Sequence, residues 1–223
     1  MVGVLSMLLA DGRFPAGGYA HSLGLEQAIE DGLRVDGVAD FVAARLRLVA
    51  EPEARISVAA RRAARADGLD GVLAVDAQFA ARCPSPVLRE SARRLGGALL
   101  RSAASVWPDG TLIDRYRRAS PGTPRPVALG VVAAATGVPD EQLAALALYD
   151  DAATVASAAL KLLPLDPAHA SRWVAEHRLW IEDAARRVAA DARPLAEQPA
   201  PAAIGLELAA RAHSDRGERL FVS

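Results

Sequence analysis

Three kinds of residue are scarce in this chain of 223 residues: cysteine, the aromatic residues and lysine. Cys83 is the only cysteine, so we expect neither an intrachain disulfide nor a thiolate metal cluster within one subunit. Aromatic residues make up 4% of the chain, which leaves few of the side chains that favour strands. Lysine occurs once, at position 161, whereas arginine is abundant. The expected environment is a reducing cytoplasm.

Long apolar runs and a strong net charge are also missing. Residues 1–11 lack the basic region of a signal peptide, and their apolar run ends at Asp11. The bland stretch 127–138 is shorter than the roughly 20 residues needed to span a bilayer. A formal net charge of -1 removes the overall attraction to phosphate that nucleic-acid binders carry. We therefore expect no membrane and no nucleic-acid partner.

The abundant residues are alanine, leucine and arginine, which lose little free energy on entering a helix. The hydrophobic content of 52% fits one folded domain over residues 1–223. Capping pairs such as Ser85-Pro86 and Asp166-Pro167 mark helix starts. The prediction is an all-α, single-domain helical bundle of about nine or ten helices. Their expected ranges are 2–10, 21–32, 37–50, 53–66, 70–82, 86–105, 126–136, 139–163 and 167–193, with a last short helix over 202–212.

Residues 107–125 are rich in proline, glycine, serine and threonine. Because such residues interrupt helices, this segment is predicted to be a surface loop or a mobile crossover.

A search for catalytic residues gives only weak candidates. The Gly17-Gly18 pair lacks the Gly-Lys-Ser/Thr ending of a phosphate-binding loop. Asp150-Asp151 is similar to the paired aspartates that hold magnesium in helical enzymes, but no carboxylate follows one turn later. A hydrogen bond between packed helices is the simpler interpretation of this pair. The chain could be an enzyme only if this pair of aspartates bound a metal ion. We predict neither a catalytic residue nor a metal ligand.

Two other groups of residues favour packing over chemistry. His169, Trp173, His177 and Trp180 share one face of the predicted helix 167–193, and the histidines are two turns, or about 12 Å, apart. One metal ion cannot bind both, so an aromatic stripe is expected. Cys83 has no obvious basic neighbour and is interpreted as an inert thiol.

The densest cluster of unusual residues spans positions 11–26. Pro15 holds the preceding residue extended, and the glycine pair permits a sharp turn into the next helix. On that helix Ser22, Glu26 and Glu30 share one face, which would be solvated in a simple helix hairpin. A hairpin does not account for the whole series. The candidate residues are Phe14, Pro15, Gly17, Gly18, Tyr19, His21, Ser22 and Glu26.

This cluster resembles the N-terminal signature of the UreF family of urease accessory proteins: an aromatic residue or leucine, Pro, any residue, Gly-Gly, an aromatic, a small residue, then Ser-x-Gly-Leu-Glu. The likeness continues in family order along the whole chain. It covers Arg89–Leu100, Pro126–Gly130, Ala158–Leu165, and the terminal residues Arg211, His213, Arg219, Leu220 and Phe221.

The resemblance implies an all-α homodimer that acts as a scaffold without catalysing a reaction. It implies binding to the accessory protein UreD (also called UreH) and recruitment of the GTPase UreG. Nickel would then reach the urease apoprotein as transferred cargo, and the chain itself would need no cofactor. Residues 205–223 would form a partner-binding C-terminal tail.

Lys161 lies between leucines in an apolar helix, where burying an unpaired ammonium would cost several kcal/mol. Its amine must therefore reach water or find a partner. We hypothesise that it pairs with a carboxylate on a neighbouring helix or at a subunit interface.

An alternative function is regulation of the partner GTPase's hydrolysis through a loop arginine. Arg118 and Arg125, in the predicted loop, are the candidates, because an inserted arginine can stabilise the transition state of GTP hydrolysis by several kcal/mol.

Overall fold

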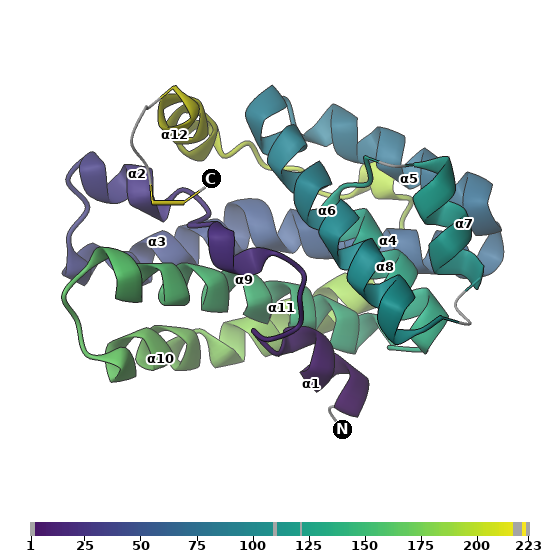
Figure 1. Cartoon of the computed structure of the whole chain (residues 1–223), viewed down its shortest axis with the longest axis horizontal. Helices are drawn as coiled ribbons and strands as arrows, with labels where there is room; N and C mark the ends of the chain where they lie inside the picture. Colours follow the sequence, from purple (N-terminus) through teal and green to yellow (C-terminus); the bar gives the residue numbers. More distant parts are fainter. Residues whose placement is uncertain (1–2, 109–110, 121, 216–219, 222–223) are drawn as a thin grey trace.

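The computed structural model describes residues 3–108, 111–120, 122–215 and 220–221, and within them it is built only from helices and connecting segments (Figure 1). The α-helices are α1 (Val4–Ala10), α2 (Leu25–Glu30), α3 (Val38–Arg45), α4 (Glu51–Ala66), α5 (Gly68–Arg82), α6 (Pro86–Val106), α7 (Thr111–Ala119), α8 (Arg125–Thr136), α9 (Asp140–Leu162), α10 (Pro167–Glu176), α11 (Arg178–Ala190) and α12 (Ile204–Ser214). Short 3-10 helices cover Gly18–Ala20, Val35–Gly37 and Leu195–Glu197, and a π-helical segment covers Leu46–Ala50. The all-α prediction is confirmed.

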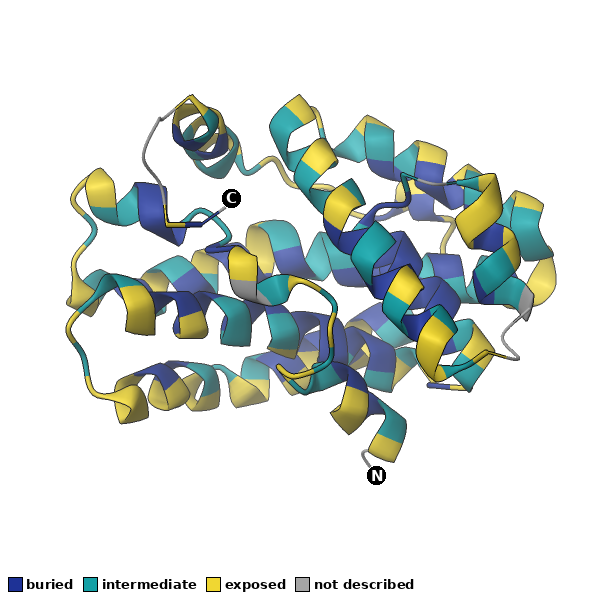
Figure 2. Ribbon diagram, viewed as in Figure 1, coloured by how far each residue is buried: buried dark blue, intermediate teal, exposed yellow. Residues whose placement is uncertain are grey.

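The core is centred on α4, α8 and α9. Helix α8 is buried from Pro126 to Ala133, and buried and exposed faces alternate on the surrounding helices (Figure 2). At Gly130 an added Cβ would overlap the carbonyl oxygen of Ser57 on α4. The glycine therefore allows α4 and α8 to approach each other closely.

Most predicted helix ends are correct because local capping chemistry fixes them. The Ser85 hydroxyl accepts a hydrogen bond from the amide of Leu88, and the Asp166 carboxylate accepts one from the amide of Ala168. Each is followed by a proline in the first turn, as predicted.

The predicted boundary between helices 37–50 and 53–66 is wrong. The chain stays helical from Val38 to Ala66, through the π-helical segment that separates α3 from α4. Pro52 has no amide to donate and would interrupt an ordinary helix, but here it lies in the first turn of α4 after the widened turn.

Two further predictions need correction, one of a helix and one of a loop. The range 167–193 is two helices, because the backbone leaves the regular helix at His177, where φ is -88° and ψ is 0°. The aromatic stripe expected along it is therefore split between α10 and α11. The segment 107–125 is not simply a loop, since α7 lies within it and buries Ile113 and Tyr116 completely.

Among the described residues, α9 is the one helix that passes a length and composition test for crossing a membrane. It is longer than the apolar stretch 127–138, which is too short to span a bilayer. Of its apolar window, 61% is buried inside the molecule, as is usual for the central helix of a bundle.

Candidate functional site

The segment before α2 is a turn that packs against α6. The ring of Phe14 stacks on Trp107 with centroids 6.2 Å apart, and the Ser102 hydroxyl donates to the carbonyl of Pro15 at 2.6 Å. Gly17 adopts a φ of +84°, which favours glycine, whereas Gly18 begins a 3-10 turn without a positive φ. Only the first of the two glycines is thus required by the backbone conformation.

Helix α2 begins at Leu25 and not at residue 21, because Leu23 and Gly24 have positive φ values of 54° and 90°. A simple helix hairpin would leave Ser22 and Glu26 solvated, but both are buried. Glu26 donates its backbone amide to the Ser22 hydroxyl at 3.4 Å. A buried carboxylate at this position needs partners from elsewhere in the chain.

The partners of Glu26 come from the C-terminus. Its carboxylate accepts hydrogen bonds from the amides of Leu220 at 2.7 Å and Phe221 at 3.0 Å. The buried His213 on α12 has its Nε2 3.2 Å from the carbonyl oxygen of Phe221 and 3.8 Å from the Glu26 carboxylate. In Figure 1 the described C-terminal residues 220–221 lie beside α2. We call Glu26, His213, Leu220 and Phe221 the tail latch.

Lys161 reaches the tail latch from the last turn of α9. Its ammonium lies 5.1 Å from the centre of the Phe221 ring, within the range of a cation–π interaction. The side chain is exposed, so the ammonium keeps water around it. The pairing of Lys161 with a carboxylate on a neighbouring helix or at a subunit interface stays a hypothesis.

A cavity of about 170 Å³ lies beneath α12, between it and the helices α3, α4, α6 and α9. Arg45 donates to both carboxylate oxygens of Asp151, at 2.9 and 2.6 Å, and to the carbonyl of Leu23 at 2.9 Å. Arg125 donates to Asp150 at 2.6 Å. Both aspartates therefore serve ion pairs between helices, in agreement with the simpler interpretation of this pair.

Four ionisable groups on the cavity wall have displaced pKa values. Burial lowers the pKa of Arg45, but the paired Asp151 outweighs this effect and raises it above the usual value. Burial, with Asp151 close by, raises the pKa of the half-buried Glu53 to about 7. Burial and the charges of Arg125 and Arg94 lower the pKa of His21 to about 4. Burial also raises the pKa of the Cys83 thiol to about 11, which keeps it protonated at neutral pH.

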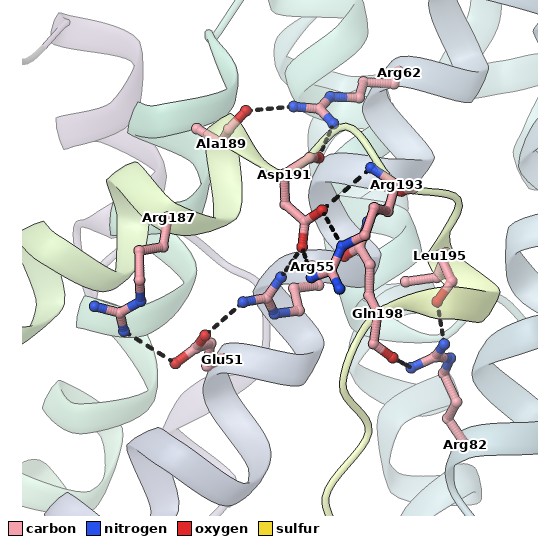
Figure 3. Close-up of polar contacts among 10 residues, drawn as sticks. All are labelled: Glu51, Arg55, Arg62, Arg82, Arg187, Ala189, Asp191, Arg193, Leu195 and Gln198. Carbon is pink, nitrogen blue, oxygen red and sulfur yellow. Dashed lines mark hydrogen bonds and ion pairs between the residues drawn. The ribbon is translucent and has the colours of Figure 1, made fainter.

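The connection from α11 to α12 is held by arginines of α4 and α5 (Figure 3). Arg55 bridges Glu51 at 2.7 Å and Asp191 at 2.8 Å, and Arg62 donates to the carbonyl of Asp191 at 2.7 Å. Arg82 donates to the carbonyls of Leu195 and Gln198, which also lie in this connection. These bonds fix the segment from which α12 extends over the cavity.

Comparison with known proteins identifies the family. The UreF family model matches residues 34–178, more than half of the chain. Proteins named urease accessory protein UreF are similar over 97% of this chain and 97% of their own length. They include those of Mycobacterium sp. strain JLS (35% identity), Mycobacterium bovis (34%) and Mycobacterium tuberculosis (33%). The chain belongs to the UreF family. The signature turn and the tail latch lie outside the range of the family model, but the similarity to these UreF proteins extends over almost the whole chain.

The structure brings together several of the residues that the UreF resemblance selected. Glu26, Lys161, His213, Leu220 and Phe221 meet at the tail latch. The other residues selected by the resemblance lie elsewhere. Phe14, Pro15 and Gly17 pack on α6, whereas Gly18 and His21 line the cavity. Ser22 is buried just before α2, and Arg211 is exposed on α12. Arg219 and the side chain of Tyr19 lie outside the described residues.

Arg118 and Arg125, the candidates for regulating GTP hydrolysis, lie in helices and not in a loop as predicted. Arg125 starts α8, and its guanidinium is bound to Asp150. Arg118 lies in the last turn of α7 with an exposed side chain, 4.0 Å from Asp114. Of the two, Arg118 is the one whose guanidinium is accessible to a partner.

Sequence reasoning missed Arg45 and Glu53, although a signal was present. Arg45 lies seven residues after Val38 and three after Val42, on the buried stripe of α3. Glu53 lies eight residues after Arg45, beyond the π-helical segment, at a spacing that fits the same helical stripe. A charged residue on an apolar stripe is a candidate for a buried ion pair or a polar cavity.

Proposed function

We propose that this chain is a non-enzymatic scaffold for urease maturation. It binds UreD/UreH and recruits the GTPase UreG, and the assembled proteins deliver nickel to the urease apoprotein in the cytoplasm. Nickel is cargo of the assembly and not a cofactor of this chain. The working form is a homodimer.

The observation that carries the proposal is the meeting of three distant segments at the tail latch. Membership of the UreF family supports a role in urease maturation, and the tail latch supplies a place where a partner can dock. Next to the buried residues, Leu220 is 63% exposed, and Ile204 and Leu208 on α12 are 66% and 64% exposed. Ile204 and Leu208 are four residues apart and therefore neighbours on one face of α12. Contiguous exposed apolar side chains are a feature of protein-binding surfaces.

The test is a pull-down with this chain as bait, followed by a urease activity assay in nickel-supplied cells. Leu208→Glu and Leu220→Glu place a charge on the proposed surface and should reduce capture of UreD/UreH and urease activity at least tenfold. Leu179→Glu is the matched control, because Leu179 is equally exposed on α11. Full capture of UreD/UreH by both tail variants would refute this docking surface, and active urease in cells lacking the chain would refute the scaffold.

Regulation of GTP hydrolysis is the second candidate function, and the exposed Arg118 is the observation in its favour. Single-turnover GTP hydrolysis by UreG should then rise strongly when this chain is added, and Arg118→Ala should remove the increase. Equal rates with the wild-type chain and with the variant would leave the scaffold as the only proposal.

A further inference from the structure

The cavity beneath α12 is lined by apolar side chains and by two ion pairs. In each pair, Arg45–Asp151 and Arg125–Asp150, a nitrogen and an oxygen lie 2.6 Å apart. Apolar side chains from α4, α5, α6 and α12 form the walls, together with a residue of the π-helical segment. The wall residues are Leu48, Ile56, Phe79, Leu88, Leu95 and Leu206.

Glu53 is a cavity carboxylate that belongs to neither of these two ion pairs. Within the described part of the chain, no hydrogen bond reaches its side-chain oxygens, and the negative charge of Asp151 opposes its ionisation. Arg45 and Arg125 are close enough to attract it, but each is already bound to an aspartate. The remaining titratable or charged groups on the cavity wall are His21, Arg82, Cys83, Glu207 and His213.

When Glu53 is ionised, the groups lining the cavity are therefore one positive charge short of balance. The two ion pairs cancel, Arg82 offsets Glu207, and the charge of Glu53 remains. At a pKa of about 7, Glu53 exchanges its proton near neutral pH. A bound cation would supply the missing charge and a hydrogen-bond donor at once.

We infer that this cavity is a binding site for the guanidinium or ammonium head of an aliphatic chain, with Glu53 as its counter-ion. The head would lie beside Glu53 and the ion pairs, and the methylene groups would contact the apolar walls. A cavity of about 170 Å³ is of the size that holds one small organic molecule. The source is either an arginine or lysine side chain of a protein or a free small cation. This inference does not depend on the scaffold function.

The test uses the full chain and n-butylguanidinium, with binding measured by calorimetry at pH 6 and pH 8. Affinity should rise about tenfold between these values, because the ionised fraction of Glu53 rises about tenfold around a pKa of about 7. Glu53→Gln should weaken binding at pH 8 at least tenfold and remove the pH dependence. Glu90→Gln removes the same charge from an exposed site on α6 and should bind like the wild type.

Two further probes define the chemistry and its source. The uncharged pentanamide should bind at least tenfold more weakly than n-butylguanidinium at pH 8. Binding of blocked arginine, N-acetylarginine methylamide, would indicate a protein side chain, whereas binding of n-butylguanidinium alone would indicate a free small cation. Equal binding of pentanamide, unchanged affinity in Glu53→Gln, or no heat with 10 mM n-butylguanidinium would overturn the inference. Circular dichroism checks that Glu53→Gln is folded.

Discussion

Asp151 and Arg45 form a pair in which neither side chain has much contact with water. Removing one partner leaves the other charge buried and unpaired, which typically costs 3–5 kcal/mol. We therefore predict that Asp151→Ala lowers the free energy of unfolding by about 3–5 kcal/mol. Chemical denaturation gives this quantity. Glu90→Ala breaks the exposed pair with Arg94 and should cost less than about 1 kcal/mol. Equal losses of unfolding free energy in the two variants would contradict the assignment of Arg45 and Asp151 as a buried ion pair.

Gly130 is a second residue whose surroundings decide its role. A methyl group there would overlap the backbone of α4 at Ser57, so α8 would have to move away. We predict that Gly130→Ala destabilises the protein by about 1–3 kcal/mol or more through overpacking. Gly205→Ala is the control, because nothing lies within 4 Å of its added Cβ and alanine favours helix α12. The thermal midpoint should fall in the first variant and stay or rise in the second.

At the scale of elements, the tail latch joins α2, α12 and the C-terminal residues, with Lys161 of α9 beside it. Glu26 alone accepts both tail amides, so Glu26→Ala should release Leu220 and Phe221 without unfolding the bundle. Hydrogen bonds to a charged acceptor are worth about 1.5–3 kcal/mol. We predict amide exchange at least tenfold faster at these two residues, measured by nuclear magnetic resonance. Unchanged exchange rates would show that other contacts hold the tail.

The elements also show which parts of the UreF fold local sequence can predict. The capped starts of α6 and α10 were predicted correctly, because a side chain satisfies an amide two or three residues away. Helix α7 was missed because the surrounding proline and glycine residues indicated a loop. A pattern that predicts a helix was nevertheless present, because Ile113 and Tyr116 are three residues apart, as on one helix face. In the structure both side chains are fully buried.

At the scale of the whole molecule, Glu53 makes stability depend on pH. The raised pKa means that the folded protein binds more protons than the unfolded chain between about pH 4.5 and pH 7. The contribution of Glu53 to stability therefore falls as pH rises through this window. We predict that Glu53→Gln gains about 1–3 kcal/mol relative to the wild type between pH 5 and pH 8.

Urea denaturation of both proteins at several pH values tests this prediction. His21, whose pKa is lowered to about 4, weakens folding below about pH 6.5 in both proteins, so its effect cancels in their difference. A difference that stays constant between pH 5 and pH 8 would contradict the raised pKa of Glu53.

The sequence by itself determined the helical class, most helix boundaries and the family resemblance, because these depend on composition, periodicity and signature motifs. Only the tertiary structure decided which charges are paired and where the tail lies. Arg45 and Asp151 are 106 residues apart, and Glu26 and Phe221 are 195 apart. No local pattern specifies such pairs, because packing of the whole bundle brings them together and removes the water that would otherwise solvate them. The same packing leaves Glu53 without a hydrogen-bond partner among the described residues.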